Sequence, residues 1–232
     1  ARVEALCAHG IEGLEHTLAP EAGAFTPETV VLYCWRGGLR SRSMVAFLRA
    51  LGRTDVCGIE GGYRSYRADV RARIEGWNAP EGFVLRGLTG VGKTLVLREL
   101  ARIRPAWVLD LELLAGHRSS ILGMVGLAPA SQKLFESRLA ARFEAGLGPV
   151  CVVEGESRKV GDLVLPEPLW RTIDRGTPLE VTASVPRRVQ VLLDDYLSSA
   201  DSRTELLRQL PFIEARLGAH WLRTRLEPIR SA

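Results

Sequence analysis

A glycine-rich loop, Gly87-Leu88-Thr89-Gly90-Val91-Gly92-Lys93-Thr94, carries the strongest chemical signal in the sequence. It follows the apolar run Phe83-Val84-Leu85 and opens into a helical pattern that begins at Leu95. Strand, loop and helix in that order form a P-loop, in which backbone N–H groups and a helix N-terminus surround a phosphate. We expect the loop to bind a phosphate or diphosphate. Lys93 would contact the terminal phosphate, and Thr94 is the candidate ligand for a phosphate-bound Mg²⁺.

Cys34 is the second candidate centre, because it follows the strand pattern Thr29–Tyr33 and precedes a glycine-bearing loop and a helix. Backbone N–H groups at such a position lower a thiol pKa and favour the thiolate. Arg36 and Arg40 would strengthen the effect and bind an anionic group brought to the sulfur. A thiol of this kind suits a carrier of sulfur or selenium as a persulfide-type adduct. The alternative is a structural cysteine.

Carboxylates follow two further predicted strands and are candidates to orient Mg²⁺ through water. Asp110 ends one of these strands, and Glu154 ends the other, with Glu156 two residues later. Neither carboxylate lies in a standard Walker B run. The alternative for each is a helix N-cap or a first-turn carboxylate, which is common at strand–helix turns.

Other charged side chains are candidates to contact the bound anion. Arg118 and Arg158 are candidate diphosphate ligands, and His117 is a candidate donor or acid. The alternatives are a structural histidine and solvated turns whose salt bridges contribute little. A predicted basic helix is either solvated or in contact with a phosphate backbone; its arginines are Arg64, Arg67, Arg71 and Arg73.

The elements that must position these residues alternate between strand and helix. Strands are expected at 29–33, 55–59, 83–85, 106–109, 149–153 and 179–183, and helices at 3–18, 41–51, 64–75, 129–145 and, with breaks, 186–226. Such alternation predicts an α/β fold with a parallel sheet, whose ligands bind beyond the carboxyl ends of the strands. The Gly- and Pro-containing segment 76–81 is the expected linker between two domains.

Composition narrows the class of protein. A chain of 232 residues with 46% hydrophobic residues suits one large or two small globular domains. No apolar run reaches the length of a membrane span, and the N-terminal residues show no secretory signal. The four separated cysteines favour neither a zinc site nor a disulfide framework, so we expect a cytoplasmic protein and structural roles for Cys7, Cys57 and Cys151. The net charge of +4 only suggests a polyanionic partner.

The motifs together resemble a known family. Cys-x-Arg-Gly-Gly-x-Arg-Ser at 34–41 and Glu-Gly-Gly-Tyr at 60–63 look like the second half of a rhodanese domain, and a P-loop follows at 87–94. This pairing resembles the tRNA 2-selenouridine synthase family. The resemblance continues through Asp110-Leu111-Glu112, His117-Arg118-x-Ser120 and Glu154-x-Glu156-Ser157-Arg158, and covers roughly residues 30–226.

The resemblance implies a domain plan. Residues 1–75 would hold the C-terminal half of a rhodanese-like domain, 76–81 the linker, and 82–232 a P-loop NTPase-like parallel-sheet domain with a helical C-terminal tail. A first strand with an Asp-x-Arg turn is not recognisable before Val30. We therefore expect the chain to begin inside the rhodanese domain and to stop short of the family's usual C-terminal tail.

The resemblance also implies an activity. The family replaces sulfur by selenium in wobble 2-thiouridine of tRNA, using selenophosphate, and S-geranylates that base from geranyl diphosphate. Lys93 would then steady the leaving diphosphate and Cys34 would serve selenium delivery, as carrier or acid–base partner, with tRNA lying across both sites. Expected partners are tRNA, small phosphates and a selenophosphate-producing enzyme, without a membrane or a tightly bound cofactor. The alternatives are an ATP-dependent kinase or NTPase with a rhodanese module, and a plain sulfurtransferase.

Overall fold

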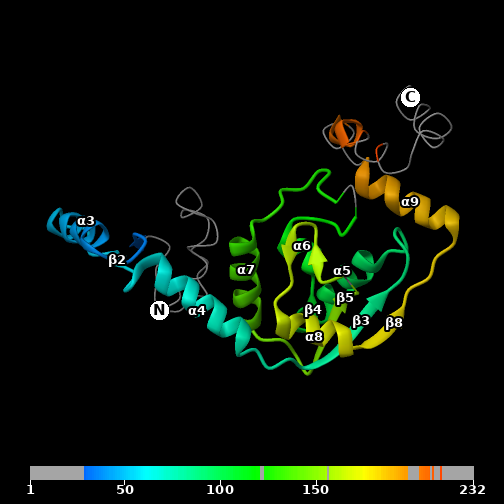
Figure 1. Ribbon diagram of the computed structural model, residues 1–232, viewed down its shortest axis with the longest axis horizontal. Coiled ribbons are helices and arrows are strands. Elements are labelled where there is room, and N and C mark those ends of the chain that lie inside the picture. Colours follow the sequence, from blue (N-terminus) through cyan, green and yellow to red (C-terminus); the bar gives the residue numbers. More distant parts are fainter. Residues whose placement is uncertain are drawn as a thin grey trace. The chain divides into compact units, whose positions relative to one another are not determined.

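The structure is a computed structural model that describes residues 29–120, 123–155, 157–197, 204–209, 211 and 215. The chain divides into two compact units (Figure 1). The first holds the described residues up to Ala79 together with 131–147 and 166–169. The second holds 80–130, 148–165 and the described residues from Trp170 onward.

The first unit begins with a strand–helix–strand arrangement. β1 (Val30–Leu32) pairs in parallel with β2 (Val56–Gly58), and α3 (Leu39–Ala50) connects them. Parallel neighbours need such a crossover because a tight turn cannot reverse the chain twice. Val31 and Val56 are almost fully buried where the strands meet the unit's core.

Two parallel helices complete the first unit. In α4 (Gly62–Glu75), Arg67 contacts the start of α7 (Gln132–Glu144), while Arg73 pairs with Glu144 at its end. The two helices therefore run in the same direction. After α4, the ring of Trp77 stacks on Phe143 with centroids 3.9 Å apart. The sequence assigned α7 to the predicted second domain, whereas the structure groups it with the first unit.

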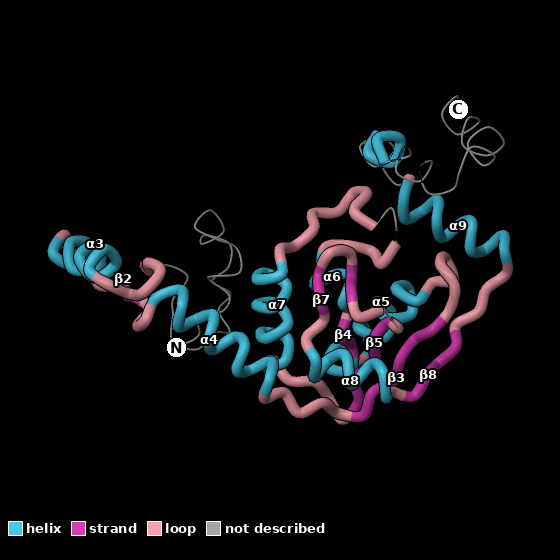
Figure 2. The backbone as a smooth tube through the Cα atoms, viewed as in Figure 1, coloured by secondary structure: helices cyan, strands magenta, loops and turns pink. Residues whose placement is uncertain are grey.

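The second unit is built on a four-stranded sheet in the order β4-β5-β3-β8 (Figure 2). Its strands are β3 (Glu81–Arg86), β4 (Val108–Leu109), β5 (Val150–Glu154) and β8 (Thr177–Glu180), and every neighbouring pair is parallel. The carboxyl ends of β3 and β5 lie side by side, with Leu85 opposite Glu154. This register brings the residues that follow both strands to one edge of the sheet.

Helices and a hairpin surround this sheet. Leu97 of α5 (Lys93–Ile103) packs with Leu85, Val108 and Val152 in a buried cluster between the helix and the sheet. The remaining elements are the 3₁₀ turn η2 (Pro105–Trp107), α6 (Leu111–Ala115), the β6–β7 hairpin (Lys159–Val160 and Leu163–Val164), α8 (Glu167–Arg175) and α9 (Val185–Tyr196). None of the described helices is long and apolar enough to cross a membrane.

The predicted α/β class with a parallel sheet is confirmed. The predicted strand 179–183 instead spans Thr177–Glu180, and α6, α8 and the β6–β7 hairpin were not expected. α9 and residues 204–209 are helical within the predicted tail. The predicted helix at 3–18, Cys7 and the rest of that tail lie outside the described residues.

Candidate functional site

Cys34 lies two residues beyond β1, in the loop that leads into α3. Its Sγ accepts hydrogen bonds from the backbone N–H of Gly38 at 3.2 Å and the hydroxyl of Ser41 at 3.3 Å. The Ser41 hydrogen bond, with further help from the N–H groups of Gly38, Arg36 and Ser41, outweighs desolvation and lowers the thiol pKa from 9.0 to about 6. At neutral pH the sulfur is therefore mainly a thiolate.

The predicted arginines do not contact the Cys34 sulfur, and the other described cysteines differ from Cys34 in burial. Arg36 and Arg40 are exposed, and among the described residues the hydrogen bonds to the sulfur come from Gly38 and Ser41 rather than from a guanidinium group. Cys57 is half-buried and its burial raises its pKa, while Cys151 is buried. Cys34 is therefore the described cysteine with thiolate character.

The Glu-Gly-Gly-Tyr motif and the residue after it hold the Cys34 loop through backbone hydrogen bonds. The N–H of Tyr63 donates to the carbonyl of Cys34 at 3.0 Å, and the N–H of Arg64 donates to that of Trp35 at 3.0 Å. Gly62 has φ of +64°, and a Cβ there would lie 2.1 Å from the Cys34 carbonyl oxygen. Only glycine combines this left-handed backbone with so close an approach.

In the second unit, the P-loop runs from the end of β3 to the start of α5. Lys93 is the first residue of α5, and its Nζ donates to the carbonyl of Gly87 at 3.1 Å. Gly90 has φ of +82°, and a Cβ there would meet the Arg188 carbonyl oxygen at 2.8 Å. The loop is thus held between its own lysine and α9, and the N–H groups at the start of α5 face an anion site.

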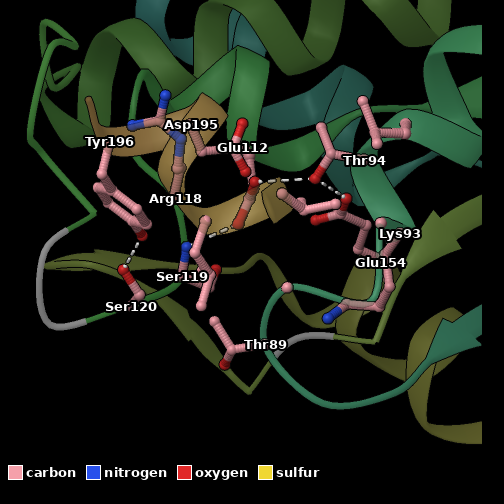
Figure 3. Close-up of a pocket in the computed structure, with 15 residues that line it drawn as sticks. Thr89, Lys93, Thr94, Glu112, Arg118, Ser119, Ser120, Glu154, Asp195 and Tyr196 are labelled. Atoms are coloured by element: carbon pink, nitrogen blue, oxygen red, sulfur yellow. Dashed lines mark hydrogen bonds between the residues drawn. The ribbon is translucent and has the colours of Figure 1, made fainter. Parts of the chain in front are cut away.

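Three side chains meet at the floor of this loop (Figure 3). The hydroxyl of Thr94 donates to Oε1 of Glu154 at 2.7 Å and lies 3.4 Å from Oε2 of Glu112. Glu154 is 1% exposed, and Oε1 of Glu112 accepts the N–H of Ser119 at 2.7 Å. Desolvation raises the pKa of Glu112, and nearby Asp110 adds to that rise. The predicted pair Thr94 and Glu154 is therefore brought together, with Glu112 as a third member.

The opposite wall of the pocket combines the loop after α6 with α9 (Figure 3). Oγ of Ser120 and the hydroxyl of Tyr196 are 2.6 Å apart. The guanidinium carbon of Arg118 lies 5.1 Å from the centre of the Tyr196 ring, and its NH1 donates to the carbonyl of Val125 at 2.8 Å. Desolvation raises the pKa of Tyr196, so its hydroxyl stays protonated. Arg188 donates to the carbonyl of Thr89 at 3.0 Å, so α9 also braces the P-loop.

The resulting cavity has a volume of about 80 Å³. Its polar lining combines the predicted site residues with further side chains, of which Glu112 and Ser120 belong to the motifs that carry the family resemblance. The predicted ones are Thr89, Gly90, Gly92, Lys93, Thr94, Arg118 and Glu154, and the added ones include Glu112, Ser119, Ser120, Asp195 and Tyr196. Spacing offered no signal for Asp195 and Tyr196, which lie about 100 residues from the P-loop in sequence.

Several other predicted residues do not line this cavity. Asp110 caps α6, where Oδ1 accepts the N–H of Leu113 at 2.8 Å, and burial raises its pKa. His117 packs under the β6–β7 hairpin, where its ring lies 3.0 Å from the position that a Cβ on Gly161 would take, and burial lowers the pKa of His117.

The remaining predicted residues lie outside the cavity lining for other reasons. Arg158 is exposed at the start of that hairpin. Gly87 and Val91 belong to the loop backbone, and Glu156 lies outside the described residues.

The residues at the floor fit a Mg²⁺ held largely by phosphate and water. Mg²⁺ keeps several waters and takes few protein oxygens in phosphate sites. The buried Glu154 carboxylate, the Thr94 hydroxyl and Glu112 supply such oxygens. A cluster of three or more His, Cys, Asp or Glu ligands, as in a fully protein-bound metal site, does not occur among the described residues.

Comparison with known proteins shows what the chain is similar to. Residues 80–223, more than half of the chain, match the family model described as the tRNA 2-selenouridine synthase AAA domain. A tRNA 2-selenouridine synthase of Cupriavidus pinatubonensis is 40% identical over 171 residues, and that of Bordetella bronchiseptica is 38% identical over 170; each alignment covers 72% of this chain and 45% of the relative. The corresponding protein of Nitrosomonas europaea is 32% identical over 185 residues, which cover 77% of this chain and 47% of the relative. The chain thus spans about half the length of the curated relatives it matches, and no solved structure matches it.

Proposed function

Because the chain belongs to the tRNA 2-selenouridine synthase family, we propose that it acts in replacing the sulfur of wobble 2-thiouridine in tRNA by selenium, with selenophosphate as the donor. A tRNA-modifying reaction of this kind takes place in the cytoplasm. The observation that carries the proposal is the Cys34 thiolate, which the Gly38 N–H and the Ser41 hydroxyl hold at the start of α3. A P-loop enzyme that only transfers phosphate needs no such thiolate.

The first step in this proposal is S-geranylation. The thiouridine sulfur forms a bond to C1 of geranyl diphosphate, the C1–O bond breaks, and its electron pair leaves with diphosphate. Lys93 and the N–H groups at the start of α5 stabilise the charge that develops on the leaving group. Mg²⁺ beside Thr94, Glu154 and Glu112 supplies further positive charge to that group when bound.

The second step exchanges sulfur for selenium. The selenium of selenophosphate bonds to C2 of the base, the C2–S bond breaks, and geranylthiol leaves after taking a proton. Water then cleaves the P–Se bond and releases phosphate. We assign Cys34 to this step as its acid–base partner, which supplies the proton that the leaving geranylthiol takes. Arg36 of the Cys34 loop and Arg40 of the first turn of α3 are exposed, and their guanidinium groups suit an incoming selenophosphate.

Nucleoside mass spectrometry of 2-thiouridine tRNA tests both steps separately. With geranyl diphosphate, the Lys93→Ala variant should form no geranylated nucleoside, because it lacks the cation for the leaving group. The Cys34→Ser variant should geranylate at the unchanged rate but should form no selenouridine when selenophosphate is added. Equal loss of both products in the two variants would contradict this division of roles, and no product from the unaltered chain would contradict the function.

A kinase or NTPase with a rhodanese module is the second candidate. The hydrogen bond from Thr94 to the buried Glu154, at the end of the strand beside β3, is also how an NTPase would support Mg²⁺–nucleotide. Steady ATP hydrolysis with unchanged tRNA nucleosides would favour this candidate. A plain sulfurtransferase would instead keep all of its activity in Lys93→Ala and lose it in Cys34→Ser.

A further inference from the structure

We propose that a groove in the first unit binds the single-stranded RNA that flanks the reacting uridine, an inference that rests on the proposed function. The groove has a volume of about 590 Å³. Trp35 of the Cys34 loop lines it, together with side chains from α4 and from the first turn of α7. These are Tyr63, Arg64, Arg71, Gln132 and Lys133.

Aromatic rings provide a stacking surface at the groove. Trp35 is 53% exposed although it is a large apolar side chain, and its ring centroid lies 5.6 Å from that of Tyr63. Tyr63 is in turn supported by Tyr33 and Tyr66, at 6.2 and 6.0 Å. The tyrosines are thus packed from behind while one face of the ring cluster stays open. Unpaired bases stack on such surfaces, whereas paired bases cannot reach them.

Positive charge lies directly beside these rings. Nζ of Lys133 is 5.9 Å from the centre of the Tyr63 ring. Arg64, Arg71 and Lys133 are exposed, and within the described part of the chain none of the three forms a salt bridge. Their charges are therefore available to successive phosphates of one strand.

The remaining charges of the groove cancel each other. Arg67 is 8% exposed and is bound to Glu136, Ser137 and the carbonyl of Lys133, so it joins α4 to α7 and neutralises the carboxylate. Because α4 and α7 run in the same direction, the positive ends of both helix dipoles also lie at one end of the groove. The net field favours a polyanion.

The groove begins at the loop that carries the thiolate. Tyr63 and Arg64 donate their N–H groups to the carbonyls of Cys34 and Trp35. A strand whose bases stack on Trp35 and whose phosphates contact Arg64 is thereby brought to the Cys34 loop. An acidic peptide would use the same cations but would gain little from the open aromatic face, so the observations favour RNA.

Fluorescence anisotropy with a labelled single-stranded RNA of anticodon-loop length, measured at several salt concentrations, tests the groove in the full chain. The Arg64→Ala/Arg71→Ala variant should bind about 10- to 100-fold more weakly, and its salt slope should fall by about 1.4, because two phosphate contacts are lost. Trp35→Ala should weaken binding by about 5- to 100-fold, and Trp35→Phe should restore most of it.

A charge-matched variant, Arg102→Ala/Arg175→Ala, removes two exposed arginines from elements outside the groove and should bind within about twofold of the unaltered chain. Four results would each overturn the proposal. The two double variants could lose equal affinity for RNA, or the groove variants could bind RNA unchanged. The unaltered chain could bind no RNA, or a poly-glutamate peptide could compete as well as RNA. Circular dichroism of each variant checks folding. If the unaltered chain modifies tRNA while the groove variants bind RNA normally, the groove proposal is wrong and the proposed function stands. If RNA binding depends on the groove but no tRNA nucleoside changes, the proposed function is wrong and the groove proposal stands.

Discussion

At the scale of single residues, the chemistry of the first unit depends on one hydrogen-bonded thiol. Alkylation of Cys34 by iodoacetamide should rise with a midpoint near pH 6, where its pKa lies, instead of 9.0. Ser41→Ala should move this midpoint upward, since the Ser41 hydrogen bond is the largest cause of the shift. Peptide mass spectrometry across about pH 5 to 9 measures the profile.

Cys57 supplies the control within the same chain, because burial raises its pKa and it should react only in more alkaline solution. Equal profiles for the two cysteines would contradict the prediction. The same shift affects stability: the ionised Cys34 stabilises the fold fully above pH 9.0, and that contribution is lost as the pH falls through about 6.

The sequence predicts Lys93, Thr94 and Glu154 at one edge of the sheet, and the structure joins Thr94 to Glu154 there by a hydrogen bond. The sequence could not choose between Asp110 and Glu154 as the partner of Thr94. Both follow strands. The choice depends on strand order, because β5 is the neighbour of β3 whereas β4 is one strand further away. Asp110 consequently caps a helix, and Glu154 reaches the P-loop. Lateral strand order arises from tertiary packing and leaves no local pattern in the sequence.

At the scale of elements, the turn into α4 fixes the Cys34 loop. Gly62→Ala should destabilise the chain by about 2–4 kcal/mol, because it combines a left-handed backbone with overlap against the Cys34 carbonyl. Gly52→Ala is the matched control: φ is +89° there, but nothing lies within 4 Å of the new Cβ, so about 1 kcal/mol is expected. Urea unfolding measures both, and equal losses would show that the close approach contributes nothing.

Local preference explains why α8 was not predicted and why the predicted bounds of β8 were shifted. α8 buries Leu169 and Ile173 at helical spacing, yet it is nine residues long and starts beside Pro168, which reads locally as a turn. β8 contains Pro178 and is exposed throughout, so its composition argues against a strand. Its place at the edge of the sheet permits the proline, because only β3 pairs with it. Burial of one face of α8 and pairing of β8 with β3 therefore outweighed local preference.

At the scale of the whole molecule, the two units do not correspond to two consecutive stretches of chain. The family match begins at residue 80 and includes α7, yet α7 packs on α4. A fragment of residues 80–232 should therefore bind more of the dye ANS than the full chain and should self-associate. The reason is that α7 has lost Arg67 and Trp77, the partners of Glu136 and Phe143.

Size-exclusion chromatography and ANS fluorescence measure this effect. Adding a separately prepared fragment of residues 1–79 should lower the dye signal. A monomeric 80–232 fragment that unfolds as sharply as the full chain would show instead that α7 is stable without α4.

This interleaving also bears on how the protein is made. As the chain leaves the ribosome, α4 emerges early and must wait for α7, and β5, the inner neighbour of the P-loop strand, emerges later still. The hydrogen bonds described for the Cys34 loop need the chain only as far as residue 64, whereas the P-loop lacks the Glu154 contact until β5 has been made. The thiolate loop can therefore form early in translation, and the phosphate loop is completed later.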